Sequence, residues 1–230
     1  MSYRKTVLLD ILAVLVILIF AGTVFADTFT EGGDAYMQGD YATALKKFKQ
    51  VAVKGDHRAM YALGSMYAGG NGVKRDYQQA FKWFSRAAQY GRLDAQYKLG
   101  LMYELGAGVK QNYRRAARYY QAVAKKGYAH GQFRFGQLYL QGKGVRRNPV
   151  KACAWMAVAR RNFLNSMPKD ESADANGDST LPVDTLQPSD IFVPLHMKLI
   201  DSELEKLQAQ LTPEQLREAQ QLAGEYMKYR

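Results

Sequence analysis

The chain has little of the material from which redox, metal or catalytic sites are built. Among its 230 residues there are one cysteine, Cys153, and three histidines. A single cysteine excludes an internal disulfide framework and any structural zinc site made of cysteines. His57 and His130 are not spaced as a metal-binding pair, and His196 has no second ligand nearby in the sequence. We therefore expect no cofactor, no metal ion and no catalytic residues, and a binding protein rather than an enzyme.

Acidic residues are also few, and one long stretch of the chain has none. The 32 lysines and arginines outnumber the 21 aspartates and glutamates, which gives a formal net charge of +11. No acidic residue occurs from Leu105 to Lys169, a stretch that carries fourteen lysines and arginines. With 6 prolines, 20 glycines and 47% apolar residues, the composition excludes a collagen-like or wholly disordered chain.

Residues 1–26 have the order of a secretory signal. Two cations precede an unbroken apolar run from Ile11 to Phe20, and Val24-Phe25-Ala26 matches a signal-peptidase site. The apolar stretch is shorter than the ~20 residues needed to span a bilayer core, which favours cleavage. An uncleaved anchor in the inner membrane is the alternative. Under both interpretations the positive-inside rule places residues 27–230 outside the cytoplasm, in the periplasm of a Gram-negative-type cell.

The chain contains an internal repeat with a period of 36 residues. Three segments align without a gap, at residues 59–94, 95–130 and 131–166. The aligned positions include Leu63, Leu99 and Phe135; Gly64, Gly100 and Gly136; Tyr67, Tyr103 and Tyr139; and Trp83, Tyr119 and Trp155. A Gly-x-Gly-Val turn recurs at the same interval. A fixed period of this length is typical of helical repeat proteins.

Each unit of the repeat predicts two helices joined by a turn. Leu63 and Tyr67 lie on one face at helical spacing, and Gly64 allows a neighbouring helix to approach closely. The Gly-x-Gly segment supplies the positive φ with which a helix ends. The second helix of each unit starts with a good N-cap residue, at Asp76, Asn112 and Asn148. Residues 27–58 predict a degenerate earlier unit, because one face of a terminal unit meets water.

These positions resemble those of the Sel1-like repeat family, a tetratricopeptide-related α/α repeat. The resemblance rests on the string AxYxLGxMYxxGxGVxxDYxxAxxWFxxAA along residues 59–88. It implies an all-α fold, a right-handed α/α solenoid whose first helices line a concave wall, and use as a scaffold for protein partners. Some family members carry a disulfide in each repeat and have been linked to β-lactam binding, but this chain lacks those cysteines. The family has no shared catalytic residues to transfer.

The C-terminal part departs from the period. Residues 167–194 are acidic and contain prolines, and they predict an irregular linker. Residues 195–230 predict a cap of two helices, the second of which begins with a capping box at Thr212. We expect this cap to cover Trp155 and Ala159, because a terminal repeat would otherwise expose an apolar face. An arm that clasps a partner is the alternative.

The concave wall is the default binding surface of a solenoid. The side chains predicted to line its groove are Tyr61 and Ser65; Tyr97, Leu101 and Glu104; and Phe133, Gln137 and Leu140. The alternative is that Tyr61, Tyr97 and Phe133 pack between repeats as consensus residues. Leu101 and Leu140 are the stronger indication of a groove, because the period does not demand an apolar residue at either position.

The acid-free stretch predicts a basic block that faces an anion. Its members are Lys110, Arg114, Arg118, Arg146 and Arg147. Arg114 and Arg118 are four residues apart and share a helix face. An acidic protein, phospholipid headgroups or an anionic polysaccharide of the envelope would be attracted to such a field, unless the acidic linker neutralises it. Nucleic acid is not expected as a partner, because the signal segment directs the chain away from it.

Two hypotheses of function follow from these patterns. The leading one is an exported, non-enzymatic interaction scaffold of the cell envelope that binds a protein or peptide partner in the groove. The rival is a cell-wall-associated enzyme accessory, or a module that binds an anionic polymer through residues 105–169. Only the compartment and the basic stretch support the rival.

Overall fold

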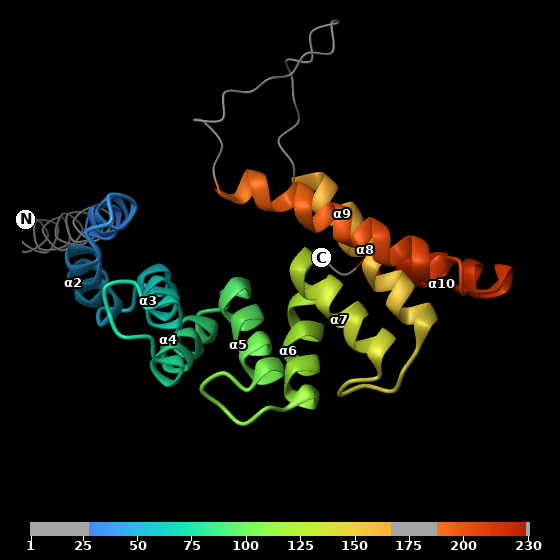
Figure 1. The fold of residues 1–230 in the computed structure, drawn as a ribbon, viewed down its shortest axis with the longest axis horizontal. Helices are drawn as coiled ribbons and strands as arrows, with labels where there is room; N and C mark the ends of the chain where they lie inside the picture. Colours follow the sequence, from blue (N-terminus) through green and yellow to red (C-terminus); the bar gives the residue numbers. More distant parts are fainter. Residues whose placement is uncertain (1–27, 167–187, 229–230) are drawn as a thin grey trace, which may run out of the picture. The chain divides into compact units, whose positions relative to one another are not determined.

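In the computed structural model the described residues are 28–166 and 188–228, with side chains described outside 188–196. They form α-helices joined by turns, without a strand in either range (Figure 1). The predicted all-α class is therefore confirmed. Within these ranges no helix is both long and apolar enough to cross a bilayer. The predicted signal segment, residues 1–26, lies outside the described residues.

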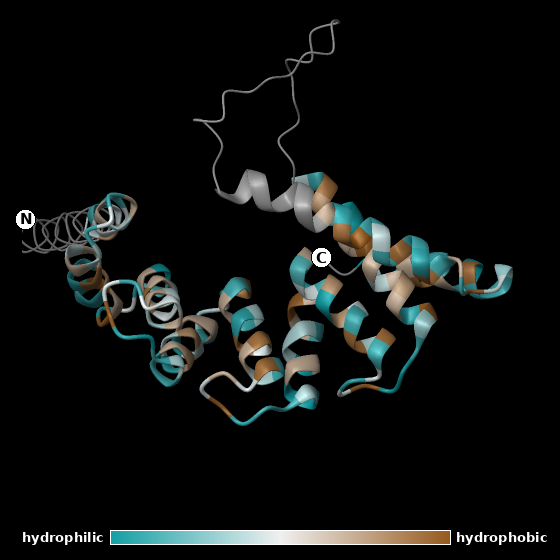
Figure 2. Ribbon diagram, in the orientation of Figure 1, coloured by the Kyte–Doolittle hydropathy of each residue, from teal (hydrophilic) through white to brown (hydrophobic). Residues whose placement is uncertain are grey.

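The helices follow one another as pairs, and each pair corresponds to one repeat. In chain order they are α2 (Tyr41–Ala52), α3 (His57–Gly69), α4 (Tyr77–Gln89), α5 (Leu93–Leu105), α6 (Tyr113–Lys125), α7 (Ala129–Gln141), α8 (Pro149–Ser166), α9 (Pro188–Gln208) and α10 (Pro213–Tyr226). Residues 28–37 are also helical and precede α2. The three repeats pair α3 with α4, α5 with α6 and α7 with α8. Figure 2 shows hydrophobic and hydrophilic positions alternating along the helices, as expected where each helix buries one face.

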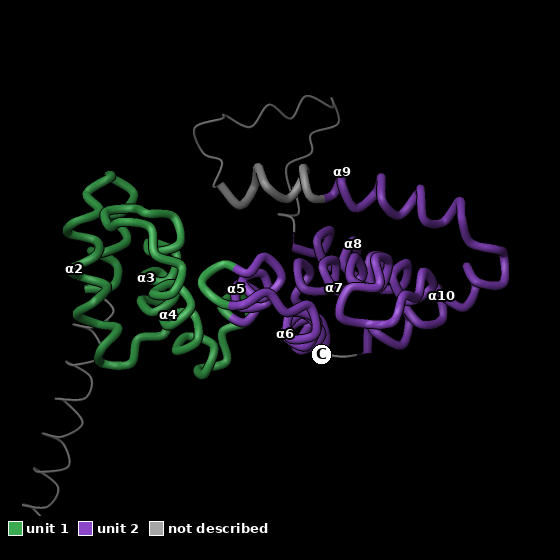
Figure 3. The backbone as a smooth tube through the Cα atoms, turned by 60° about the horizontal axis from the view of Figure 1, so that its bottom comes forward, with its two compact units in different colours: residues 1–95, 107–109 green, residues 96–106, 110–230 purple. Residues whose placement is uncertain are grey.

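Two compact units divide the chain, and α5 contributes to both (Figure 3). The first unit comprises residues 1–95 and 107–109, and the second comprises residues 96–106 and 110–230. Each unit has a core of its own. Fully buried side chains are Leu63, Met66 and Phe84 in the first unit, and Leu99, Tyr120, Leu138 and Met156 in the second.

The second helix of each repeat starts at the predicted N-cap residue. The side chain of Asp76 accepts hydrogen bonds from two backbone N–H groups in the first turn of α4. Asn112 accepts one from the third residue of α6, and Asn148 does the same for α8, over 2.9 Å in both cases. These acceptors satisfy N–H groups that have no partner within the helix, which is why short polar residues begin these helices.

The Gly-x-Gly turns hold each loop against a helix of the preceding unit. All six glycines of the three turns have positive φ. A Cβ atom added to the second glycine of each turn would lie only 2.2–2.4 Å from the tyrosine that begins the preceding second helix. The three contacts join Gly72 to Tyr41, Gly108 to Tyr77 and Gly144 to Tyr113. Glycine is required here both by the backbone conformation and by the lack of space for any side chain.

A second set of glycines brings the two helices of one repeat together. A Cβ atom on the helical glycine of each first helix would lie within 3 Å of a buried side chain on the second helix. The pairs are Gly64 with Phe84, Gly100 with Tyr120 and Gly136 with Met156. The close approach predicted from Gly64 is therefore present in all three repeats.

Helices α9 and α10 cover the last repeat, as the sequence predicts. Apolar residues of α9, among them Ile200 and Leu204, share a buried cluster with Ala159 of α8. On α10, the ring of Tyr226 stacks on Trp155, with 4.1 Å between the ring centroids. Helix α10 begins with the predicted capping box, in which Thr212 and a glutamine three residues later exchange hydrogen bonds.

The start of α9 differs from the prediction. The linker was expected to extend to residue 194, but α9 begins at Pro188 and continues through Pro194. Proline breaks a helix because it lacks an N–H and crowds the preceding turn, yet its fixed φ is itself helical and suits the first turn. This accounts for Pro188 at the start of α9, whereas Pro194 lies seven residues into the helix and supplies no N–H to the preceding turn. The remainder of the predicted linker, residues 167–187, lies outside the described residues.

Three glycine-to-alanine substitutions separate the roles of conformation and space. Gly144→Ala should lower the free energy of unfolding by about 2–3 kcal/mol, because its positive φ and the carbonyl oxygen of Tyr113 both oppose a side chain. Gly127 also has positive φ but has open space around it, so Gly127→Ala should cost about 1 kcal/mol.

Gly224 is the control, since it lies within α10, has open space and has no positive φ. Gly224→Ala should leave stability unchanged or raise it by about 0.5–1 kcal/mol. Urea denaturation of the purified variants measures all three. Equal effects of Gly144→Ala and Gly127→Ala would show that the close contact of the loop does not matter.

Candidate interaction surfaces

The residues predicted to line the groove lie on the first helices of the three repeats. Tyr61 and Ser65 are on α3 in the first unit, and both are half-buried. Tyr97, Leu101 and Glu104 are on α5 in the second unit, where they are also half-buried. We call Tyr61, Ser65, Arg92 and Asp94 the first-helix surface of the first unit. We call Tyr97, Leu101, Glu104, Arg134 and Gln137 the first-helix surface of the second unit.

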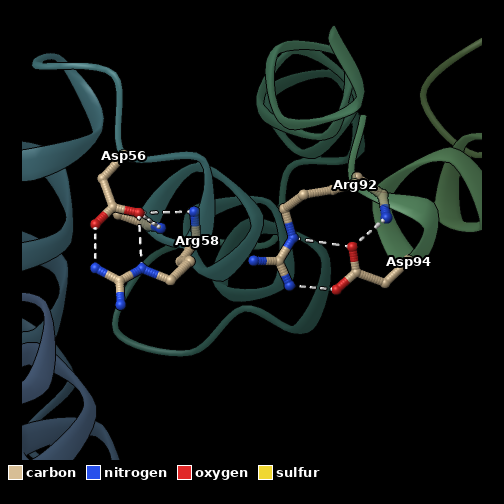
Figure 4. Close-up of polar contacts among 6 residues, drawn as sticks. Asp56, Arg58, Arg92 and Asp94 are labelled. Carbon is tan, nitrogen blue, oxygen red and sulfur yellow. Dashed lines mark hydrogen bonds and ion pairs between the residues drawn. The ribbon is translucent and has the colours of Figure 1, made fainter. Parts of the chain in front are cut away.

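Figure 4 shows two arginine–aspartate pairs of the first unit. Arg92 and Asp94 belong to the first-helix surface, and Asp56 and Arg58 lie at the start of α3. Arg92 donates to Asp94 from Nε over 3.0 Å, and its guanidinium lies 5.0 Å from the ring centroid of Tyr61. Arg58 donates to both carboxylate oxygens of Asp56, over 3.2 and 2.8 Å. Each aspartate also accepts a hydrogen bond from the backbone at the start of a helix, α3 or α5. The two guanidinium groups are thereby held in fixed positions.

The environment of Asp56 changes its acidity. Burial alone would raise the pKa of this carboxyl group, but hydrogen bonds from the Arg58 side chain and from two backbone N–H groups outweigh burial and lower the pKa. The same side-chain hydrogen bond raises the pKa of Arg58. Both shifts favour the charged forms of the pair.

In the second unit, a chain of polar contacts runs across the first-helix surface. The Tyr120 hydroxyl donates to Glu104 Oε2 over 2.6 Å, and Arg134 Nη1 lies 3.8 Å from Glu104 Oε1. The same Nη1 donates to Gln137 over 3.1 Å. Gln137 in turn donates to Glu203 of α9 over 3.0 Å. The network joins α5, α6, α7 and α9. Glu104 and Glu203 stand at its two ends, and Arg134 lies between them.

Burial and charge act together on this network. Burial and the hydrogen bond to Glu104 both raise the pKa of Tyr120, so its hydroxyl remains a donor. Burial raises the pKa of Tyr97 as well. Burial would lower the pKa of Arg134, but the charge of Glu104 outweighs it and the pKa rises. The arrangement can hold a charged or hydrogen-bonding group of a partner with little further ordering of side chains.

The third-repeat portion of the predicted groove is covered by the chain itself. Phe133 is buried in the cluster that α9 closes, so it lines no open groove. Leu140 packs against the same cluster, and Gln137 is bonded to Glu203 of α9. For Phe133 the predicted place in an open groove is therefore wrong and the alternative, packing between repeats, is borne out, whereas Leu140 is half-buried. A helix that lies far away in the sequence occupies the face that the repeat pattern left open.

Two aromatic rings of the second unit pack beside Tyr97. The ring centroid of His130 lies 5.7 Å from that of Tyr97 and 4.8 Å from that of Phe163. Tyr128 lies 5.5 Å from Tyr97. His130 thus packs among rings between repeats, and the alternative weighed for Tyr97, packing as a consensus residue, describes part of what this side chain does.

All five cations of the predicted basic block are exposed. Arg114 and Arg118 lie on α6, and Arg146 and Arg147 lie in the loop before α8. Arg147 donates to the backbone carbonyl of Leu140 over 3.1 Å. Lys110 lies in the turn before α6. The acidic residues of the predicted linker up to residue 187 lie outside the described residues.

Sequence reasoning missed several residues that shape these surfaces. Arg92 and Arg134 lie at non-equivalent positions of the repeat, and Glu203 belongs to the cap. The only sequence signal for the pairs in the first unit is the spacing of two residues between Asp56 and Arg58, and again between Arg92 and Asp94. Arg134 and Glu203 have no such short spacing in the sequence. Gln137 links them, since it accepts a hydrogen bond from Arg134 and donates one to Glu203.

The described residues offer little for metal or thiol chemistry. No group of three or more histidine, cysteine, aspartate or glutamate side chains within them could hold a metal ion. Cys153 is buried in the cluster between α8 and α9, and burial raises the pKa of its thiol. A neutral, buried thiol packs as a small apolar group, which is the role predicted for it.

Helix pairs that repeat every 36 residues, with polar side chains held in place on their first helices, define a helical-repeat protein of the solenoid class. The Sel1 repeat model matches residues 57–91, 93–128 and 129–161. The chain therefore contains three Sel1 repeats. This family is generally a protein–protein interaction fold and is typically a scaffold without enzymatic activity.

Solved structures agree with this family. A Sel1 repeat protein from Oxalobacter formigenes is 27% identical, with a TM-score of 0.54 over 60% of this chain and 58% of that one. A protective antigen present in uropathogenic Escherichia coli strains, which displays an SLR fold, is 22% identical, with a TM-score of 0.53 over 89% of this chain and 46% of that one. This chain thus spans about half the length of either protein. No curated protein matches the sequence.

Substitutions at Asp56 separate its cap from its ion pair. Asp56→Ala removes both the acceptor at the start of α3 and the partner of Arg58, so the free energy of unfolding at pH 7 should fall by about 1 kcal/mol. Asp56→Asn keeps a capping oxygen and should cost less. Because the folded-state pKa is lowered, the contribution of the charge is complete above about pH 4 and is lost as the pH falls through the folded pKa.

Urea denaturation at pH 7 and at several values below pH 4 tests this dependence. The wild-type protein should lose stability on acidification more steeply than either variant. Parallel curves for all three proteins would mean that the Asp56–Arg58 pair makes no contribution through charge.

Proposed function

We propose that this protein is an exported, non-enzymatic scaffold of the bacterial cell envelope that binds a protein or peptide partner on its first-helix surfaces. The family supports the class of function, because Sel1 repeat proteins bind protein partners in general. The observation that carries the proposal is the polar network of Glu104, Arg134 and Gln137 on the second unit. Side chains ordered before a partner arrives reduce the entropy lost on binding.

The first unit offers the same kind of surface. Tyr61 is held under the guanidinium of Arg92, and Asp94 fixes that guanidinium from the other side. Tyrosine and arginine are the residue types that contribute most to protein interfaces, because each combines apolar area with hydrogen bonding. Together these features support recognition of a peptide rather than chemistry on a substrate.

Export is supported by the N-terminal sequence. The cations, apolar run and small residues of residues 1–26 have the order of a signal that the secretion machinery recognises. Expression of the full chain in a Gram-negative host should place it in the periplasmic fraction, with Asp27 as its first residue. Mass spectrometry of that fraction measures both. Intact protein in the inner-membrane fraction would support the anchor instead, and protein in the cytoplasm would contradict export.

Substitutions on the first-helix surface test the partner site. Cross-linking in cells, followed by recovery of the tagged protein, should give a partner band that Leu101→Asp strongly reduces. A carboxylate at this half-buried position opposes apolar contact and adds a charge that must be desolvated. Val53→Asp is the control, since Val53 is 68% exposed just after α2 and belongs to the first unit. If both variants recover the partner equally while remaining folded, the first-helix surface is not its site.

The exposed basic block favours a second candidate function, the binding of an anionic polymer. Reversal of Arg114, Arg118, Arg146 and Arg147 to glutamate should elute the protein from a dextran sulfate column at much lower salt. Thermal stability should change by only a few degrees, because exposed ion pairs contribute about 0–1 kcal/mol each. The wild-type interaction should weaken steeply with salt, since exposed charges are screened over ~8 Å at physiological ionic strength.

A charge-matched variant controls for net charge. It reverses four exposed lysines of the first unit, which are Lys46, Lys49, Lys74 and Lys82. Equal elution of the two variants would show that retention follows net charge alone and that the basic block is not a site.

A further inference from the structure

One position of the repeat carries a large aromatic ring on the second helix of each of the three repeats. Trp83, Tyr119 and Trp155 occupy it on α4, α6 and α8. In the last repeat this ring has a partner within the chain, because Tyr226 of α10 stacks on Trp155 at an interplanar angle of 11°. The contact leaves Trp155 only 3% exposed. The protein therefore already shows what this position binds, which is an aromatic side chain from an amphipathic helix.

A tyrosine close to a cation recurs in both repeats of the second unit. Tyr139 and Tyr103 are equivalent residues on α7 and α5. The ammonium of Lys151 lies 5.8 Å from the ring centroid of Tyr139, and the guanidinium of Arg115 lies 5.3 Å from that of Tyr103. In the earlier of these repeats the tyrosine also stacks on the second-helix ring, Tyr119.

In the earlier repeat these groups line a cavity instead of a filled contact. The volume of the cavity is about 390 Å³, and its walls come from both helices of the repeat, with Gln96 and Tyr103 on α5 and Arg115 and Tyr119 on α6. The rings of Tyr103 and Tyr119 are stacked, 5.8 Å apart at 16°. A cavity with apolar rings and a few fixed polar groups is typical of a binding site.

The polar groups of the cavity are cationic. Arg115 donates to the hydroxyl of Tyr103 over 3.0 Å, so its guanidinium is held at the cavity wall. Arg118 lines the cavity and is exposed, and Arg114 is exposed on the same helix. Because no acidic residue occurs from Leu105 to Lys169, the local field attracts a negatively charged segment.

We propose that this cavity binds an aromatic side chain from an acidic helical segment of a protein partner, in the way that the last repeat holds Tyr226. The inference rests on the proposed function only in that the protein binds protein partners. It adds a site apart from the first-helix surface of the second unit. Stacking on Tyr119 supplies apolar contact, and Arg115 and Arg118 select acidic residues next to the aromatic one.

A set of labelled peptides tests the proposal on the purified chain. The probe is a short helical peptide with one tryptophan flanked by glutamates, carrying fluorescein for anisotropy. One matched peptide replaces the tryptophan by alanine, and another replaces the glutamates by lysine. The probe should bind at least about tenfold more tightly than either matched peptide, because each matched peptide lacks one of the two recognised groups. Equal binding of the tryptophan and alanine peptides would overturn the proposal.

Protein variants locate the site. Tyr119→Ala and Arg118→Glu should each weaken probe binding by about tenfold, whereas Tyr119→Phe should retain it, since the ring is kept. Arg146→Glu makes the same charge change outside the cavity, and Trp83→Ala removes the equivalent ring of the first repeat. Both controls should bind as wild type. If Arg146→Glu weakens binding as much as Arg118→Glu, the probe responds to net charge and the cavity is not its site.

Two further outcomes would also contradict the inference. Binding of anionic phosphatidylglycerol vesicles that Tyr119→Ala abolishes, without any binding of the probe, would assign the cavity to a lipid surface. Dimerisation that Tyr119→Ala abolishes, without any binding of the probe, would assign the cavity to a second copy of the chain. Failure of the peptide experiment leaves the cross-linking result with Leu101→Asp unaffected, so this inference and the proposed function fail separately.

Discussion

The close approach of each Gly-x-Gly loop to the start of the preceding second helix is the constraint on which the rest of the structure depends. At Gly108 and Gly144 a Cβ atom would lie 2.4 and 2.2 Å from a tyrosine carbonyl oxygen. The same loops carry the residues that cap the next helix, so a shift of the loop would also displace the cap. The helical glycines of α3, α5 and α7 act in the same way between the helices of one repeat. Two sets of glycines therefore fix the spacing on which both the cores and the surfaces rely.

The cap decides which surfaces remain for partners. Repeat proteins need a terminal element that covers the apolar face of the last unit. Here α9 buries Phe133 and binds Gln137, while α10 stacks Tyr226 on Trp155. In the last repeat, Phe133, Gln137 and Trp155 therefore make their contacts with other parts of the same chain. The half-buried face of α5 and the cavity beside Tyr119 are the surfaces for which we propose partners. They differ in chemistry, since one carries a carboxylate–arginine network and the other carries cations among rings.

Much of the fold follows from the sequence because the responsible interactions are local. Asp76, Asn112 and Asn148 begin their helices as predicted, since each satisfies N–H groups two or three residues away. The start of α9 was predicted wrongly, because two prolines indicate a break only in the absence of other support for the helix. The exposure of Phe133 was also predicted wrongly. Its position in the repeat carries no information on a helix that arrives from about sixty residues further along the chain.

The sequence by itself determined the period, the helix pairs, the caps and the glycine turns, because each depends on residues close together in the chain or on exact recurrence of a spacing. Only the tertiary structure decided which faces of these helices are covered. Gln137 and Glu203 meet across 66 residues, and Tyr226 reaches Trp155 from the last helix. Such contacts depend on where α9 and α10 pack, and packing is set by the fit of buried surfaces, which no single spacing in the sequence records.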